Sequence, residues 1–131
     1  MKHLSDYTQE GITNVMNKYG AFFAFSKSQF EAAKVEGLQY ESLSSGMIVP
    51  VGKGKAVIEE INAVGDAGIA QDIAENGLEA IIKRELYNHE CFYTGDWKEA
   101  AFQGAFEGYD ISEEDVHKVY RAEYAHAMES L

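Results

Sequence analysis

A glutamate and a histidine four residues apart are the side chains of this protein best suited to chemistry. Glu85 and His89 lie in residues 78–90, where apolar residues recur at helical spacing. On an ideal helix both polar groups fall on the apolar face, where a hydrogen bond between them would offset the cost of burial. With Glu90 beside them, they could hold a transition metal or form an acid/base centre.

As a catalytic motif, the pattern around this pair is incomplete. A helical zinc site of the HExxH type needs a second histidine where this chain has Tyr93, and two ligands alone leave a zinc site unfinished. A structural pair that fixes how the helix meets a loop at 91–95 is the alternative. We therefore expect no enzyme, no cofactor and no metal. A small metal-dependent or acid/base enzyme centred on Glu85 and His89 is kept as the second hypothesis.

A glycine-rich segment, Val51 to Lys55, precedes a predicted helix and offers two lysines. Glycines let backbone N–H groups approach an anion at a helix N-terminus, so a protein that sequesters a phosphorylated nucleotide is a third hypothesis. The segment lacks the Walker spacing and the Ser or Thr that follows its lysine. A solvated loop after Pro50 is the competing interpretation.

Charge is distributed very unevenly along the chain. Residues 1–58 hold 6 Lys/Arg and 5 Asp/Glu, whereas residues 59–131 hold 5 Lys/Arg and 17 Asp/Glu, for a total net charge of −11. Phosphate backbones and anionic lipids both recruit Lys and Arg, so they would be repelled by the acidic half. We expect no direct binding to nucleic acid or membrane, and instead a partner protein with a basic surface.

The carboxylates most suited to such a partner lie between residues 99 and 115. Three of them would occupy the first turn of the last helix, where the helix dipole also stabilises them, so a merely solvated surface is the alternative. Trp97, beside a predicted helix cap, is the candidate aromatic anchor. The predicted partner-binding residues are Trp97, Glu99, Glu107, Asp110, Glu113, Glu114 and Asp115.

The elements that would position these residues suggest an α+β fold. A helix over 7–19, a buried strand over 21–25, and a helix begun by a Ser26/Gln29 capping box and ended at Gly37 come first. Strands over 38–43 and 46–50 would complete a small antiparallel sheet of about three strands, packed with helices. The remainder is predicted to be all helical.

Start and stop signals divide that helical part. Gly65 and Gly68 should weaken or bend the helix that begins near residue 55, and Asn76–Gly77 should end it. Asp96 and Glu99 would open a helix to Gly108, and Ser112 with Asp115 would cap the last one. An apolar content of 46% and the length of 131 residues predict a single domain, 1–131. A single cysteine and the lack of an apolar leader or membrane span indicate the cytoplasm.

The chain resembles a family of small acidic proteins from phages and gut-bacterial mobile elements at Gly20–Ser26 with Gln29–Phe30, and again at Arg84–Glu90 with Tyr93–Asp96. Proteins of that setting often inhibit host defence, as anti-CRISPR and anti-restriction proteins do, by occupying basic nucleic-acid channels. The resemblance implies an inhibitor that blocks a basic groove of a nucleic-acid-handling protein in the host cytoplasm. It implies no catalytic residues, and a homo-oligomer stays open.

Overall fold

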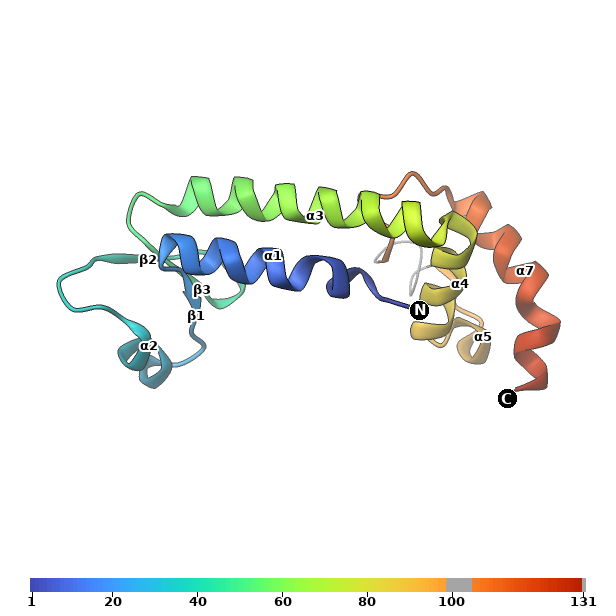
Figure 1. The fold of residues 1–131 in the computed structure, drawn as a ribbon. Helices are drawn as coiled ribbons and strands as arrows, with labels where there is room; N and C mark the ends of the chain where they lie inside the picture. Colours follow the sequence, from blue (N-terminus) through green and yellow to red (C-terminus); the bar gives the residue numbers. More distant parts are fainter. Residues whose placement is uncertain (99–104, 131) are drawn as a thin grey trace. The chain divides into compact units, whose positions relative to one another are not determined.

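The computed structural model describes residues 1–98 and 105–130 of the chain. They form two compact units, Met1–Gly68 and Ile69–Leu131, whose boundary falls inside helix α3 (Gly54–Asn76). The expected α+β class is confirmed, with a small three-stranded antiparallel sheet and a helical C-terminal part (Figure 1). No helix in these described ranges is long and apolar enough to cross a membrane. A single domain over 1–131 stays a prediction.

The first unit begins with α1 (Leu4–Tyr19), close to the predicted 7–19. His3 N–H donates to the Asp6 carboxylate at 2.8 Å, which satisfies a backbone donor at the helix start. At its end Gly20 takes a left-handed conformation (φ 68°), and the next amide, that of Ala21, donates to Met16 O at 2.9 Å. This is the glycine stop expected from the sequence.

The sheet consists of β1 (Phe22–Phe23), β2 (Tyr40–Ser42) and β3 (Met47–Pro50), in the order β1-β3-β2. All three strands are shorter than predicted. Burial of the first one was predicted wrongly, because Phe23 is exposed and Phe25, beyond the strand, is 74% exposed. A run of apolar residues indicates β propensity, but it does not show which side chains face the core. In this sheet the side chain of Val49, in β3, is fully buried.

Helix α2 (Lys27–Ala33) starts as predicted and ends early. Ser26 Oγ accepts the Gln29 N–H at 3.1 Å, while Gln29 Oε1 accepts from Phe25 N–H at 2.7 Å, one residue farther than in a regular capping box. The Phe25 ring stacks on that of Phe23, with the centroids 6.3 Å apart. The helix ends at Ala33 rather than Gly37, because Lys34 is already extended (φ −63°, ψ 150°).

Helices α1 and α3 pack closely through small residues. A Cβ on Gly11 would lie 2.8 Å from a Val64 methyl, and one on Gly68 would lie 2.4 Å from the Thr8 methyl. Gly65 and Gly68 were predicted to weaken or bend α3, yet the helix runs unbroken through both. The core beside them contains Val15, Met16, Ala21, Val49 and Val57.

The second unit contains the end of α3, then α4 (Leu78–Asn88), α5 (Cys91–Thr94) and α7 (Glu113–Glu129). Gly77 (φ 77°) separates α3 from α4 at the predicted break. The predicted loop at 91–95 is instead one helical turn, α5. The helix predicted from Asp96 to Gly108 falls largely on residues 99–104, outside the described ranges. Buried apolar residues of this unit are Ile81, Ile82, Leu86, Cys91, Phe92, Phe106, Tyr109, Ile111, Val116 and Ala127.

The last helix begins where the sequence predicts. Ser112 Oγ accepts from Asp115 N–H at 3.1 Å, and Asp115 Oδ2 accepts from Ser112 N–H at 3.0 Å. This reciprocal capping box satisfies two backbone donors. Ile111 and Val116 on either side of the cap are both buried. Tyr124, farther along the same helix, is exposed.

Candidate functional site

The Glu85/His89 pair is present but differs from the sequence prediction. The Glu85 side chain is 14% exposed and that of His89 39%, so the histidine does not lie inside the apolar core. His89 Nε2 is 3.7 Å from Glu85 Oε2, and Glu85 Oε1 accepts from Arg84 Nε at 3.0 Å. Glu90 is an exposed residue with a left-handed backbone (φ 54°). Within residues 1–98 and 105–130, no three potential metal ligands cluster.

A buried ion pair, not anticipated from the sequence, lies one residue away. Asp72 is fully buried, and its carboxylate accepts a hydrogen bond from each of the two terminal guanidinium nitrogens of Arg84, both at 2.9 Å. The Tyr109 hydroxyl donates to the same carboxylate at 2.5 Å, and the Asn76 amide donates at 2.8 Å. We call Asp72, Asn76, Arg84 and Tyr109 the buried network. It joins α3, α4 and the segment before α7.

The electrostatics of the buried network favour a fixed ion pair. Burial acts to raise the pKa of Asp72, but hydrogen bonds from Arg84, Tyr109 and Asn76 outweigh it and lower that pKa. Burial and the bond to Asp72 raise the pKa of Tyr109 to about 12. Asp72 is closed to solvent, and its hydrogen bonds link α3 to α4 and to the segment before α7. The sequence holds one sign of this network. At helical spacing, Asp72 and Asn76 fall on the same face of residues 69–76 as Ile69 and Ile73, which places two polar residues on an apolar face.

Aromatic rings form a connected cluster in the second unit. The Phe92 ring stacks on Tyr120 (centroids 5.1 Å apart), and Trp97 stacks on His117 at 4.7 Å and lies 6.4 Å from Tyr120. Tyr87 and Tyr124 extend the contacts on either side, at 4.9 and 5.8 Å. We call these six residues, Tyr87, Phe92, Trp97, His117, Tyr120 and Tyr124, the aromatic cluster.

The aromatic cluster opens to solvent at its margins. Tyr87 and Tyr124 are exposed, and Trp97 is half-buried, as an interface anchor would be. The Tyr87 hydroxyl donates to Glu123 Oε1 at 2.8 Å, which ties a carboxylate to the ring. The Glu123 side chain is only 15% exposed and is also paired with Lys83 at 3.5 Å, so this carboxylate is already engaged within the chain. The exposed tyrosine ring faces are the part of the cluster that a Lys or Arg side chain could contact.

The predicted acidic residues are partly engaged within the chain. Glu107, Asp110 and Glu114 are exposed. Glu113 is paired with Lys98 at 3.2 Å, and Asp115 is the capping carboxylate of α7, whose pKa is lowered chiefly by the Ser112 backbone N–H. Glu99 lies outside the described residues. The structure thus places Glu113, Glu114 and Asp115 together on one helical turn, with two of the three already holding an intramolecular partner.

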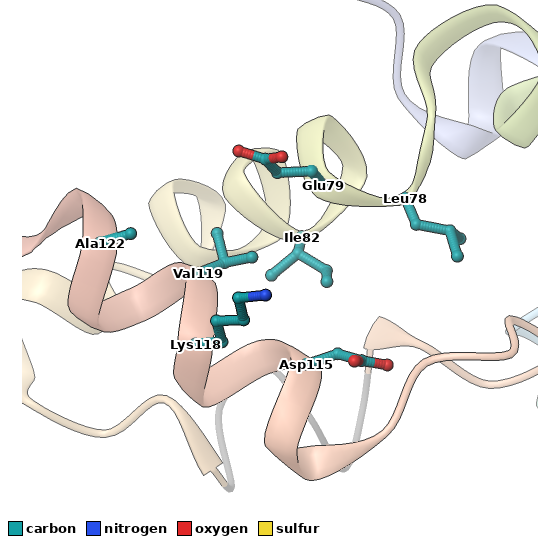
Figure 2. Close-up of a pocket in the computed structure, with 7 residues that line it drawn as sticks. All are labelled: Leu78, Glu79, Ile82, Asp115, Lys118, Val119 and Ala122. Atoms are coloured by element: carbon teal, nitrogen blue, oxygen red, sulfur yellow. The ribbon is translucent and has the colours of Figure 1, made fainter.

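A groove runs between α4 and α7 in the second unit (Figure 2). Its volume is about 270 Å³. The apolar lining residues come from both helices, and the Lys118 side chain points toward Ile82 in the view of Figure 2. The residues that line the groove are Leu78, Glu79, Ile82, Asp115, Lys118, Val119 and Ala122.

The glycine-rich segment at the start of α3 has an internal carboxylate nearby. A Cβ on Gly54 would lie 3.3 Å from Glu41 Oε1, and the Lys53 N–H donates to Pro50 O at 3.0 Å. An anion arriving at this helix end would meet a like charge. The geometry adds nothing in favour of a nucleotide site.

The family comparison covers nearly the whole chain. The model of a family of unknown function, DUF7659, matches residues 4–127. The chain belongs to this family. No curated protein and no solved structure matches it. Membership in DUF7659 assigns no activity.

In this DUF7659 member the described site residues lie in one unit. Residues 69–131 carry 5 Lys/Arg and 14 Asp/Glu, a net charge of −9, against 6 and 8 for residues 1–68, a net charge of −2. The structure joins Trp97 to α7 through His117 and places three acidic residues in the first turn of that helix. Glu107 and Asp110 precede the helix in irregular chain.

Proposed function

We propose that this protein is a non-enzymatic inhibitor or adaptor that docks its acidic, aromatic-bearing second unit into a basic groove of a nucleic-acid-handling protein. One observation carries the proposal: the aromatic cluster opens to solvent within a unit of net charge −9. Aromatic anchors supply most of the energy of protein interfaces, and complementary charge speeds and orients docking. The exposed rings of Tyr87 and Tyr124 belong to a unit of net charge −9, so this unit offers both properties.

The class of partner follows from charge. Grooves that bind nucleic acid are lined with Lys and Arg that neutralise phosphates, and an array of carboxylates can compete for the same cations. The resemblance to phage and mobile-element proteins adds the narrower proposal that the partner belongs to a host defence system, of CRISPR or restriction type, in the host cytoplasm. Docking would then block access of nucleic acid to the groove.

The proposal is tested by capture and competition. Tagged protein is used to capture partners from a lysate of the source organism, and the bound fraction is challenged with duplex DNA and with 0.5 M NaCl. We expect duplex DNA to displace the partner, because both would occupy one groove, and salt to weaken the complex by screening. A captured partner that binds no nucleic acid, or that holds DNA and this protein together, contradicts the proposal.

Charge reversal identifies the surface. Substituting Lys for Asp110, Glu113 and Glu114 should reduce affinity for the captured partner at least 10-fold without unfolding the chain. The matched control substitutes Lys for Glu10, Glu36 and Asp66, which are exposed carboxylates of the first unit and give the same change in net charge. Trp97→Ala should weaken binding as well. Equal losses in both triple variants would mean that overall charge, not this surface, drives association.

A further inference from the structure

The α4–α7 groove has the size of a binding site for one or two side chains. Sites for small molecules and cofactors usually enclose about 300–1,000 Å³, and this groove, at about 270 Å³, is smaller. Its floor is apolar, formed by side chains such as Ile82, Val119 and Leu78. These dimensions suit a Leu- or Ile-sized side chain from another polypeptide better than a complete ligand.

The polar residues around the floor indicate the charge of that polypeptide. Glu79 and Asp115 line the groove, with Lys118 as the one cation among the seven lining residues. Glu113 and Glu114 precede Asp115 in the first turn of α7. The Ser112 N–H lowers the pKa of Asp115, which favours its ionised form. Glu79 and Glu113 are also paired with lysines of the same unit, Lys83 at 3.7 Å and Lys98 at 3.2 Å. The groove is therefore an apolar slot whose rim carries Glu79, Asp115 and Lys118, in a unit whose surplus of carboxylates gives a net charge of −9.

We propose that the α4–α7 groove binds a basic amphipathic helix, whose apolar side chain enters the slot while its Lys and Arg side chains meet the carboxylates on the rim. A helix lying in a groove between two helices buries its apolar stripe through positions three and four residues apart. Complementary charge then sets its register. The inference rests on the proposed function, because it states which part of the basic partner binds to the second unit, namely an amphipathic helix.

Two fluorescein-labelled peptides provide the probes. One is a 14-residue Leu/Lys peptide with leucines at helical spacing, and the other has the same lysines with every leucine replaced by glutamine. Fluorescence anisotropy at 0.15 M NaCl should show that the Leu/Lys peptide binds at least 20-fold more tightly than the Gln/Lys peptide. Equal affinity for the two peptides, or no binding of the Leu/Lys peptide at 100 µM protein, overturns the proposal.

A substitution that fills the groove locates the binding site. Ala122 lines the groove and is exposed, so Ala122→Phe should occupy the slot without altering the core, and should weaken the Leu/Lys peptide at least 10-fold. Ala63→Phe, an exposed helical position outside the groove, is the matched control and should bind the peptide unchanged. Circular dichroism of both variants confirms their folding. Unchanged binding by Ala122→Phe overturns the groove as the site.

The results separate this inference from the proposed function. If the Lys substitutions at Asp110, Glu113 and Glu114 abolish capture of the basic partner while Ala122→Phe leaves capture intact, the function stands and the groove proposal falls. Sedimentation equilibrium of the free protein tests the other occupant. A dimer that Ala122→Phe dissociates would show that a second copy fills the groove, and would overturn the basic helix as its ligand.

Discussion

Asp72 and Arg84 show how much a buried charge depends on its partner. The carboxylate is fully buried and would be strongly disfavoured there alone, but the guanidinium, phenol and amide groups saturate its oxygens. Replacing a complete buried pair often costs little, whereas removing one member leaves an uncompensated charge. The sequence showed Arg84 only as an ordinary residue of an amphipathic helix. Its partner is 12 residues away, and no local pattern specifies such a pair.

Arg84→Met should lower the free energy of unfolding by about 3–5 kcal/mol, because Asp72 then lies buried without its cation. Urea unfolding followed by circular dichroism measures this loss. The double variant Asp72→Asn/Arg84→Met should recover a large part of it, and Lys83→Met, on the same helix but partly exposed, should change stability by less than about 1 kcal/mol. A loss for the double variant as large as for Arg84→Met alone would contradict an unpaired charge as the cause.

Cys91 should be inert to thiol reagents in the folded protein. Its side chain is fully buried, and that burial raises the pKa of the thiol from 9.0 to about 11, so little thiolate exists at pH 8. Reaction with a chromogenic disulfide reagent at pH 8 should be at least 1,000-fold slower than in 6 M urea. A Cys91→Ala/Ser130→Cys variant, with its thiol at an exposed position, provides the control for reagent activity.

The same shift has a pH consequence for stability. Because the folded pKa lies above the unfolded one, the thiol stabilises the fold fully below the unfolded pKa, and this contribution is lost as pH rises toward 11. If the thiol reagent instead labels Cys91 rapidly in the folded protein at pH 8, the prediction of an inert thiol is wrong and the segment containing Cys91 opens readily.

At the level of elements, start and stop signals predicted boundaries better than burial. The Ser112/Asp115 capping box and the Gly20 stop lie where expected, because each depends on bonds within a few residues. The exposure of Phe23 and Phe25 depends on which face of the short sheet is covered, and that is decided by residues elsewhere. Gly68 illustrates the same limit, since the sequence shows a helix breaker where the structure has a close helix contact.

Gly68→Ala should destabilise the protein although alanine is the better helix former by about 1 kcal/mol. The added methyl would lie 2.4 Å from the Thr8 methyl, so α1 or α3 must shift. Gly65→Ala is the matched control, because nothing lies within 4 Å of its added Cβ, and it should stabilise the protein by up to about 1 kcal/mol. Thermal unfolding compares the two.

A second substitution tests the contact directly. Thr8→Ser removes the methyl that Gly68→Ala would meet, so the double variant should recover most of the lost stability. Destabilisation by Gly65→Ala equal to that by Gly68→Ala would show that the glycines are needed for flexibility rather than for close packing.

For the molecule as a whole, the sequence predicted the fold class and the acidity of its later part, but not that the chain divides into two compact units at Gly68 and Ile69. Net charge is a sum over the chain, whereas its effect depends on which carboxylates the fold gathers. Residues 69–131 carry −9 of the total −11, and repulsion among them opposes folding. The engagement of Glu113 by Lys98 and of Asp115 by the α7 cap relieves only part of it.

Raising NaCl from 10 to 200 mM should therefore increase the melting temperature by several degrees, because salt screens like charges more than a Debye length apart. Differential scanning calorimetry measures the change. The variant with Lys at positions 110, 113 and 114 should respond less, since its net charge is smaller. A melting temperature that falls with salt would indicate that attractive ion pairs dominate the balance.

The strand β1 lies at an edge of the sheet, and the exposed rings of Phe23 and Phe25 stack beside it, 6.3 Å apart. Exposed apolar rings at a sheet edge favour association between molecules. The shortness of the strand opposes it, because two residues offer few backbone groups for pairing with a neighbour. Repulsion between molecules of net charge −11 then opposes this association and keeps the protein in solution. Concentrated stocks should consequently stay clear in dilute buffer and turn turbid near pH 4.7, the isoelectric point.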